Sequence, residues 1–153
     1  MGKLKDSSIH FFADEKYSSI FEQFTKRESV QVHNKNIFVL AAVVGFKNSS
    51  KIENENRGKE ILASFLTPSE EELFMNIVFQ DEKVDNDLEK LGEIIDSKEG
   101  KEIIEEYVNG GLELMVIEAF FDNWDGHELN PDYEHYYFDL IKFISTQVKN
   151  VPF

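Results

Sequence analysis

Hydrophobic residues recur along this chain with the period of an α-helix. After Asp14, whose side chain can cap the free amides of a first turn, four large apolar residues at positions i, i+3, i+4 and i+7 mark one helix face: Tyr17, Ile20, Phe21 and Phe24. Residues 34–47, which Asn34 or Asn36 can cap, are apolar nearly all round and predict a buried central helix. Residues 7–12, which precede both helices, fit a short strand or an extended arm.

The clearest signal for a helix start is Thr67-Pro-Ser-Glu70. Thr67 and Glu70 have the spacing of a capping box, and Pro68 takes the first helical position, where its missing amide costs nothing. Residues 60–66, just before this box, alternate as in a strand but also fit one helical turn, and we favour the extended form. A further helix is predicted over residues 84–95, where apolar residues are spaced by four, three and four positions.

The sequence Asn109-Gly110-Gly111 interrupts a helical pattern that Ser97 can cap. Each glycine inside a helix costs about 1 kcal/mol relative to alanine. The helix therefore either ends at this point or continues because another backbone packs closely against it. An apolar pattern resumes in residues 112–124, so a break would produce two separate helices.

These patterns predict a mainly α fold, a single-domain bundle of about seven helices over all 153 residues, with room for a minor β ribbon made by the two extended segments. Asn130-Pro131 supplies the cap and first residue of the last helix. A polar segment, residues 48–59, contains little that can be buried and is the best candidate for a mobile loop. It separates an N-terminal helical subregion, residues 1–47, from an acidic helical subregion, residues 60–153.

Charge divides the chain at this polar segment. Residues 1–60 hold 10 of the 16 Lys and Arg and 8 of the 30 Asp and Glu, a balance of +2, whereas residues 61–153 hold 6 and 22, a balance of −16. Such a chain is disfavoured as a nonspecific nucleic-acid binder, because phosphate binding rests on Lys and Arg. The acidic half is the better candidate for contact with a basic partner protein. The side chains predicted to make this contact are Glu70, Glu71, Glu72, Glu102, Glu105 and Glu106.

The composition restricts the remaining classes of chemistry. The chain has no cysteine, which excludes disulfides, thiolate metal sites and cysteine nucleophiles and agrees with a cytoplasmic protein. No stretch has the length and apolarity of a membrane span, and the N-terminus lacks the apolar core of a secretory signal. We therefore expect a cytoplasmic protein with no membrane segment.

The densest group of potential metal ligands lies in residues 122–128. Trp124 stands where an EF-hand needs an oxygen ligand, and His127 and His135 are too far apart for the HExxH spacing. The glutamates of residues 102–118 lack the Glu-x-x-His pairs of carboxylate-bridged metal proteins, which indicates a solvated acidic face. We therefore expect no catalytic residue, metal or cofactor. The alternative, a metal-dependent hydrolase, would use Asp122, Asp125, His127 and Glu128.

Two stretches carry a family resemblance: Asn36-Ile-Phe-Val-Leu-Ala-Ala-Val-Val-Gly-Phe-Lys47 and Ile104-Glu-Glu-Tyr-Val-Asn-Gly-Gly-Leu-Glu-Leu114. In content, order and separation they resemble the DNA phosphorothioation-associated protein 4 family, also called Dnd system-associated protein 4. The resemblance implies association with a bacterial system that replaces a phosphate oxygen of DNA by sulfur, and with neighbouring defence and restriction genes. It brings no catalytic residue. The residues that it singles out suit close helix packing: Gly45, Asn109, Gly110 and Gly111.

The leading hypothesis is a non-enzymatic accessory protein that acts by protein contact in such a system. Its acidic half would meet a basic partner, or occupy a DNA-binding surface as a phosphate mimic. The second hypothesis is direct DNA recognition by the N-terminal strand and the two helices after it, loosely on the plan of ribbon-helix-helix proteins. That strand, however, carries no pair of Arg or Lys with which to read bases.

Overall fold

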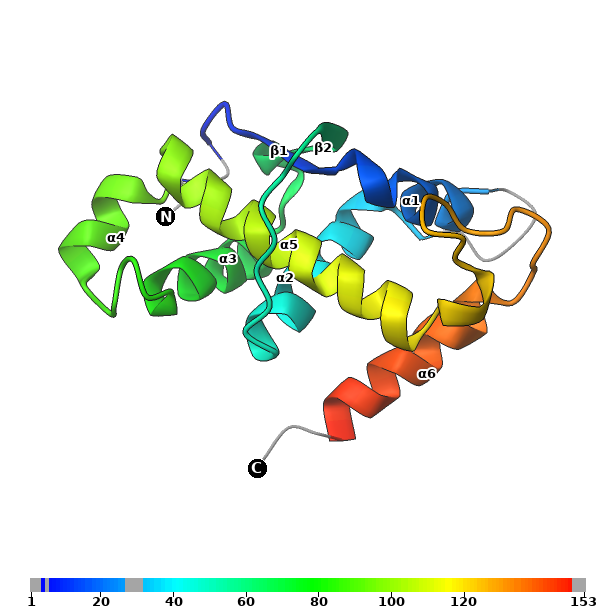
Figure 1. The fold of residues 1–153 in the computed structure, drawn as a ribbon. Coiled ribbons are helices and arrows are strands. Elements are labelled where there is room, and N and C mark those ends of the chain that lie inside the picture. Colours follow the sequence, from blue (N-terminus) through cyan, green and yellow to red (C-terminus); the bar gives the residue numbers. More distant parts are fainter. Residues whose placement is uncertain (1–3, 5, 27–31, 150–153) are drawn as a thin grey trace.

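The computed structural model describes residue 4, residues 6–26 and residues 32–149. Within these ranges the fold is mainly helical with one small sheet, so the predicted fold class is confirmed (Figure 1). The elements, in chain order, are β1 (His10–Asp14), α1 (Ser18–Phe24), α2 (Asn34–Lys47), β2 (Arg57–Leu62), α3 (Pro68–Gln80), α4 (Leu88–Ile94), α5 (Lys98–Glu118) and α6 (Tyr136–Lys149). Short 3₁₀ turns cover Glu15–Tyr17, Ala63–Phe65 and Phe121–Asn123.

The longest helix, α5, forms the axis of the molecule, and α2 packs across it (Figure 1). A Cβ atom placed on Gly111 of α5 would lie 1.9 Å from the carbonyl oxygen of Ala41 in α2. A Cβ on Gly45 of α2 would likewise lie 1.9 Å from the carbonyl oxygen of Tyr107 in α5. The two backbones therefore touch where α2 crosses α5, and only glycine fits at either position.

This contact explains why α5 runs without a break through Asn109-Gly110-Gly111. The close approach of α2 compensates for the low helix propensity of the two glycines. Two of the predicted helices are thus one, and the described residues contain six α-helices where the sequence predicts about seven.

The small sheet consists of β1 and β2, which pair antiparallel with Phe11 opposite Ile61. The ring of Phe11 is fully buried and lies 5.6 Å from the ring of Phe38 and 5.7 Å from the ring of Phe74. The sheet is therefore anchored by one aromatic cluster to α2 and α3. Extended structure near residues 60–66 is confirmed in part, because β2 begins earlier, at Arg57, and ends at Leu62.

The predicted caps locate the starts of α3 and α5. The predicted caps of α2 are wrong, since its N-cap is His33, which makes no side-chain bond, and Asn34 and Asn36 both lie inside the helix. The predicted capping box is confirmed: the Thr67 hydroxyl accepts the amide of Glu70 at 3.2 Å, and the Glu70 carboxylate accepts the amide of Thr67 at 2.8 Å. Ser97 caps α5 through the amide of Gly100. Asp14 caps the 3₁₀ turn Glu15–Tyr17, so the α-helix itself begins only at Ser18.

The predicted start of the last helix is wrong. Asn130 accepts the amide of Asp132 at 3.0 Å, which closes a turn, and α6 begins only at Tyr136. The hydroxyl of Tyr136 donates to the carbonyl of Asn130 at 2.6 Å and fastens this turn to the helix. Asn130 and Pro131 thus belong to a turn that precedes the helix, because the asparagine side chain bonds locally.

Across residues 6–26 and 32–149, no helix combines the length and apolarity that crossing a membrane requires.

Candidate functional site

The polar residues 49–56 form a strap that crosses the exposed side of α5 (Figure 1). The amide of Ile52 donates to the carbonyl of Glu106 at 2.9 Å, and the amide of Glu55 donates to the Asp14 carboxylate at 2.7 Å. The carbonyl oxygen of Ser50 lies against Gly110, where a Cβ would come within 1.9 Å of it. The segment predicted as a mobile loop is thus bonded to the helix and strand beneath it.

Asn109 connects the strap, β1 and α5. Its side chain is fully buried, and its amide oxygen accepts the backbone amide of Asp14 at 2.9 Å. Its amide nitrogen donates to the carbonyl of Ile52 at 3.1 Å and to the side-chain oxygen of Asn54 at 2.7 Å. A buried amide with this many partners holds its neighbours in one arrangement. Asn109 therefore positions the strap.

A second buried group fastens the beginning of the strap to the end of α3. The carboxylate of Asp81, which is fully buried, lies 2.8 Å from the ammonium of Lys51 and accepts the hydroxyl of Tyr107 at 2.7 Å. Its other oxygen accepts the amide of Lys83 at 3.0 Å. Burial alone would raise the pKa of Asp81, but the hydrogen bonds from Lys51 and Tyr107 outweigh burial and hold the pKa below its ordinary value.

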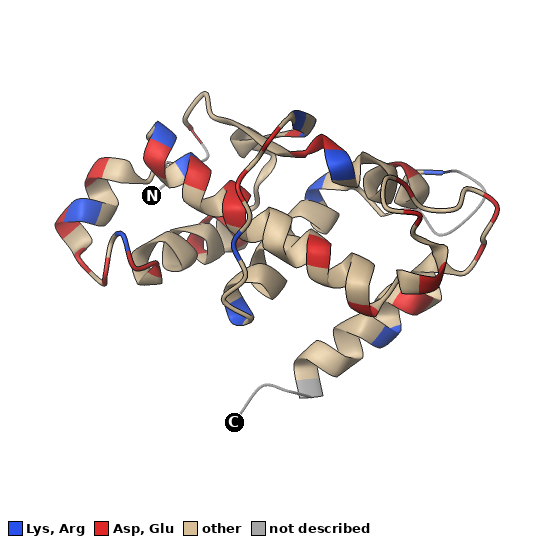
Figure 2. Ribbon diagram, in the orientation of Figure 1, with Lys and Arg blue, Asp and Glu red and all other residues tan. Residues whose placement is uncertain are grey.

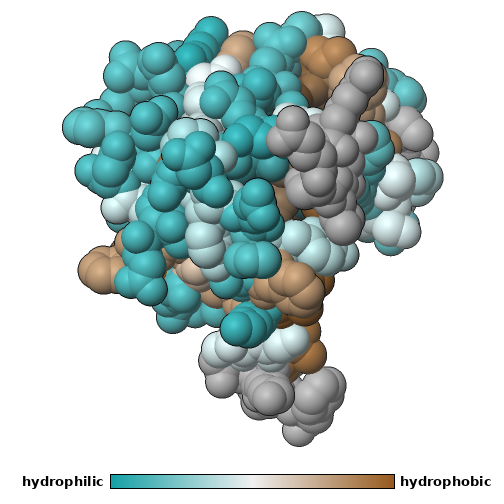
Figure 3. All heavy atoms as spheres, turned by 90° about the vertical axis from the view of Figure 1, so that its right-hand side faces the viewer, coloured by the Kyte–Doolittle hydropathy of each residue, from teal (hydrophilic) through white to brown (hydrophobic). Residues whose placement is uncertain are grey.

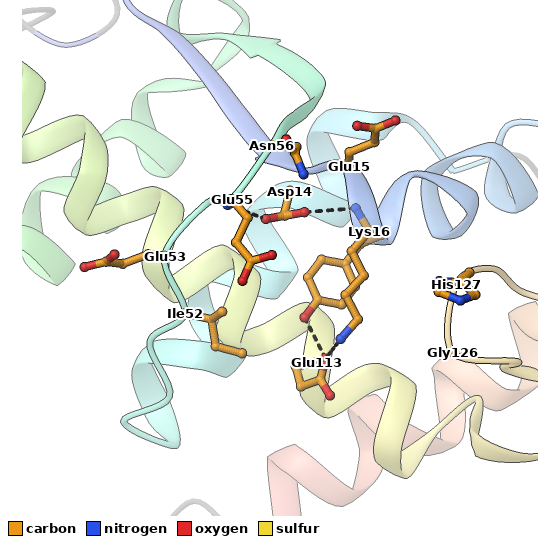
Figure 4. A pocket seen from close by; sticks show the side chains of 11 residues that line it. Asp14, Glu15, Lys16, Ile52, Glu53, Glu55, Asn56, Glu113, Gly126 and His127 are labelled. Atoms are coloured by element: carbon orange, nitrogen blue, oxygen red, sulfur yellow. Dashed lines mark hydrogen bonds and ion pairs between the residues drawn. The ribbon is translucent and has the colours of Figure 1, made fainter.

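An open cleft of about 680 Å³ lies between the strap and the loop before α6 (Figure 4). The hydroxyl of Tyr17 donates to Glu113 at 2.6 Å, and the ammonium of Lys16 lies 3.5 Å from the same carboxylate. Burial, followed by the bond to Glu113, raises the pKa of Tyr17, so the phenol stays protonated. The carboxylates of Glu55 and Glu113 both point into this cleft (Figure 4). It therefore presents negative charge beside a tyrosine that is almost fully buried.

A smaller cleft of about 370 Å³ lies on the other side of the strap, where α5 begins. Arg57 and Lys98 stand at this cleft among a larger number of carboxylates. We call the surface that joins both clefts the acidic strap face, and it consists of Glu15, Glu53, Glu55, Glu102 and Glu113. All of these side chains are exposed except Glu113, which is 29% exposed.

The charge division along the sequence is not preserved in space. Glu15, Glu53 and Glu55 come from the positive-tending first part of the chain and lie beside Glu102 and Glu113 of α5. Red segments accordingly follow the strap and the side of α5 that it crosses (Figure 2). Sequence reasoning missed the strap glutamates. The available signal was the alternation of Glu and Asn over residues 53–56, which is the period of an extended segment.

The six glutamates predicted to bind a partner do not form one surface. Glu102, Glu105 and Glu106 line the smaller cleft, whereas the three at the beginning of α3 do not. Glu71 and Glu105 are buried, with 4% and 6% of their surface exposed. Glu70 is occupied by its capping box and by Lys35, whose ammonium lies 2.8 Å away. Glu72 and Glu102 are the two with exposed side chains.

Glu105 supports β1. Its carboxylate accepts the amide of Phe12 at 2.7 Å, on the edge of β1 that does not pair with β2. Asn54 and Asn109 bond to the same edge, at the carbonyl of Phe12 and the amide of Asp14. Burial raises the pKa of Glu105, against the bond from Phe12. The expected solvated acidic face of α5 thus includes one carboxylate that serves the core.

We expect Glu105→Gln to keep the free energy of unfolding within about 1 kcal/mol of wild type at neutral pH, since the amide oxygen still accepts from Phe12. Glu105→Ala should lose about 1–3 kcal/mol, because the Phe12 amide is left without a partner. A raised pKa favours the protonated folded state, so the wild type should gain stability relative to Glu105→Gln as the pH falls towards that pKa. Urea unfolding at several pH values measures this. Equal losses in the two variants would contradict the assigned role.

The residues of the alternative metal site, Asp122, Asp125, His127 and Glu128, are not arranged around a common point. Asp125 accepts the amides of His127 and Glu128, each at 2.8 Å, and these bonds hold its pKa below the ordinary value. His127 lines the larger cleft, and Asp122 lies in the exposed turn Phe121–Asn123. Among the residues that the structure describes, no three His, Asp or Glu side chains are grouped to hold a metal ion.

In the DNA-binding hypothesis β1 would enter a groove of DNA, but both edges of β1 are bonded within the chain. One edge of β1 pairs with β2 of the same chain, and the other edge bonds to Asn54, Glu105 and Asn109. The ring of Phe12 lies 5.0 Å from the guanidinium of Arg57 and 5.1 Å from the ammonium of Lys101. Ribbon-helix-helix recognition requires a strand that is free to enter a groove. This geometry gives that hypothesis no support.

Comparison with known proteins identifies the family of this chain. A family model described as DNA sulphur modification system-associated protein 4 matches residues 13–123. The matched segment includes the glycine contact between α2 and α5, the strap, the smaller cleft and the lining of the larger cleft except Gly126 and His127. Neither the curated proteins nor the solved structures gave a match. Since the match spans about three-quarters of the chain and agrees with the resemblance of its two packing motifs, this chain belongs to the DNA sulphur modification system-associated protein 4 family.

Proposed function

We propose that this chain is a non-enzymatic accessory protein of a DNA sulphur modification system, and that it acts by binding a basic segment of another protein of that system. The acidic strap face is the binding surface. The observation that carries the proposal is the gathering of five carboxylates from the turn after β1, the strap and α5 around two clefts.

The strap gives these carboxylates fixed positions. Its backbone, Asn54 and Lys51 make the tethering bonds, while the carboxylates of Glu53 and Glu55 remain exposed. A surface that is ordered before binding loses less conformational entropy when the partner docks. The face is therefore suited to recognise Lys and Arg side chains in one defined arrangement.

The larger cleft offers a cation more than negative charge. Tyr17 lines this cleft, the ammonium of Lys16 lies over its ring at 5.6 Å from the centroid, and the ring of Trp124 stacks on the Tyr17 ring with centroids 6.4 Å apart. A Lys or Arg side chain gains from both an aromatic ring and a nearby carboxylate. Lys16 reaches the Glu113 carboxylate at 3.5 Å and marks where a cation of the partner would compete.

The proposal predicts that Glu53→Gln/Glu55→Gln/Glu102→Gln weakens binding to the partner by about tenfold, since each exposed charge contributes up to about 1 kcal/mol. These changes spare the strap, because Glu55 bonds Asp14 through its backbone amide and the Lys98–Glu102 pair is solvent-exposed. The matched control is Glu72→Gln/Glu89→Gln/Glu93→Gln, three exposed glutamates on α3 and α4.

Titration calorimetry with each purified protein of the modification system measures the affinities. The control should bind within about twofold of wild type, because its three charges lie outside the proposed binding surface. Equal weakening of both triple variants would show that only net charge matters, and unchanged binding by the first variant would remove the acidic strap face from the interface.

A further inference from the structure

The C-terminal helix α6 has two apolar faces. The inner face consists of Tyr136, Leu140 and Phe143, which are buried, and the ring of Tyr136 meets the ring of Phe120 at 5.6 Å. The outer face consists of three exposed residues, Phe138, Ile141 and Val148, together with Tyr137 and Ile144, which are half-buried and pack against the core with part of their surface. A helix that is apolar on both sides needs a second surface to cover it.

The outer face is a regular one. Tyr137, Ile141, Ile144 and Val148 are spaced by four, three and four positions, which is the seam of a helix that packs on a partner. Phe138 and Val148 stand at its two ends with 65% and 56% of their surface exposed. Among the side chains of α6 that the structure describes, no charged one belongs to this face, and Asp139 and Lys142 lie on the flank that faces Glu118.

The helix also projects from the body of the molecule. Figure 1 shows α6 running away from α5 at the lower right, and Figure 3 shows hydrophobic (brown) side chains on one side of the part of the molecule that projects downwards. Its far end is held at Gln147, whose carbonyl accepts the ammonium of Lys47 and whose side-chain oxygen accepts the amide of Asn48 at 3.0 Å. The outer face is thus presented on a fixed helix.

We propose that α6 inserts its outer face into an apolar groove on a protein of the sulphur modification system, and that basic residues line the rim of this groove. This inference rests on the proposed function for the identity of the system, but it concerns a different surface. In this mode of recognition an amphipathic helix places anchors at i, i+3, i+4 and i+7 into the partner. Phe138 is the largest exposed anchor.

Area and charge favour such a groove over a second copy of this chain. At 1.5 Å per residue, α6 is about 21 Å long and about 10 Å wide, so pairing it with α6 of another copy covers far less than the roughly 800 Å² per partner of a stable interface. Two copies would also bring together two chains of net charge −14. A groove also reaches the flanks of the helix, where the carboxylates of Glu118 and Asp139 outnumber the ammonium of Lys142, and a basic rim complements this excess of negative charge.

The test uses the full chain and the purified proteins of the system. Phe138→Ser/Ile141→Ser should weaken binding of one of them by at least about tenfold, as expected for truncated anchors. The matched control is Phe65→Ser/Leu88→Ser, which removes two exposed apolar side chains elsewhere, 62% and 73% exposed, and should bind as wild type does. Val148→Ser provides a milder variant at the other end of the face.

Three results would overturn the inference. Light scattering could show a wild-type dimer that the Phe138→Ser/Ile141→Ser variant loses, which would assign the face to a second copy. A chain ending at Lys149 could gain affinity, which would assign it to the chain's own last residues. Unchanged affinity of both outer-face variants is the third. If the acidic strap face variant still weakens binding in that case, the proposed function stands; if neither set does, or if no protein of the system binds, both fail.

Discussion

Replacing Gly111 by alanine is expected to lower the free energy of unfolding by about 2 kcal/mol or more. The new Cβ would lie 1.9 Å from the carbonyl oxygen of Ala41, whereas ordinary contact begins at 3.4 Å. Since the obstacle is backbone on both sides, α2 and α5 must move apart, and overpacking of this kind costs about 3 kcal/mol at the upper end of its usual range. The gain of about 1 kcal/mol in helix propensity offsets only part of this.

The matched control is Gly92→Ala in α4. A Cβ at Gly92 meets no heavy atom within 4 Å, so this change should stabilise the protein by about 0.5–1 kcal/mol through helix propensity alone. Urea unfolding of both variants measures the difference. A Gly111→Ala protein as stable as wild type would mean that α2 and α5 are not in backbone contact.

The second large effect is expected at Asp81. Asp81→Ala should lower the free energy of unfolding by about 3 kcal/mol, because it leaves Lys51 and the Tyr107 hydroxyl without their acceptor. This loss is at the lower end of the usual range for breaking a buried ion pair, because 21% of the surface of the Lys51 side chain is exposed and can be solvated when Asp81 is removed. Tyr107→Phe removes one hydrogen bond and should lose about 1 kcal/mol.

The same carboxylate predicts a pH dependence. Because the folded-state pKa of Asp81 is lowered, its charged form stabilises the fold near neutrality, and this contribution is lost as the pH falls through the folded-state pKa. Asp81→Asn should therefore lose less stability than wild type below about pH 4, the ordinary pKa of an aspartate. Glu102→Gln, which removes an exposed pair with Lys98, should change stability by less than about 0.5 kcal/mol and serves as the control. Parallel pH profiles for wild type and Asp81→Asn would contradict the role of Asp81.

The sequence predicted those elements whose causes are local. The capping box at Thr67 and the apolar run of α2 act within a few residues, and both helices lie where these signals put them. The continuity of α5 depends on Ala41, about seventy positions away, so Gly110 and Gly111 alone could not decide between a break and a close contact. The turn at Asn130 was misread because asparagine caps helices and closes turns with the same side chain.

The candidate site was less predictable than the fold. A count of charges along the chain favoured the helices after Thr67, but the fold buries Glu71 and Glu105 and brings Glu53 and Glu55 onto α5. The deciding contacts are long-range, from Asn109 to Asp14 and to the strap. The family, by contrast, could be predicted from the sequence. The backbone contact between α2 and α5 requires glycine at Gly45 and Gly111, and both residues belong to the two motifs of the resemblance.

Binding of a basic protein surface by the acidic strap face is tested most directly by the salt dependence of the affinity. Titration of the wild-type chain with each purified protein of the modification system should give one partner whose affinity falls steeply between about 0.1 M and about 1 M salt, as the Debye length shortens from about 10 Å to about 3 Å. The fall should be shallower for Glu53→Gln/Glu55→Gln/Glu102→Gln. Affinity that is independent of salt, or the same salt dependence in this variant and in wild type, would contradict the account.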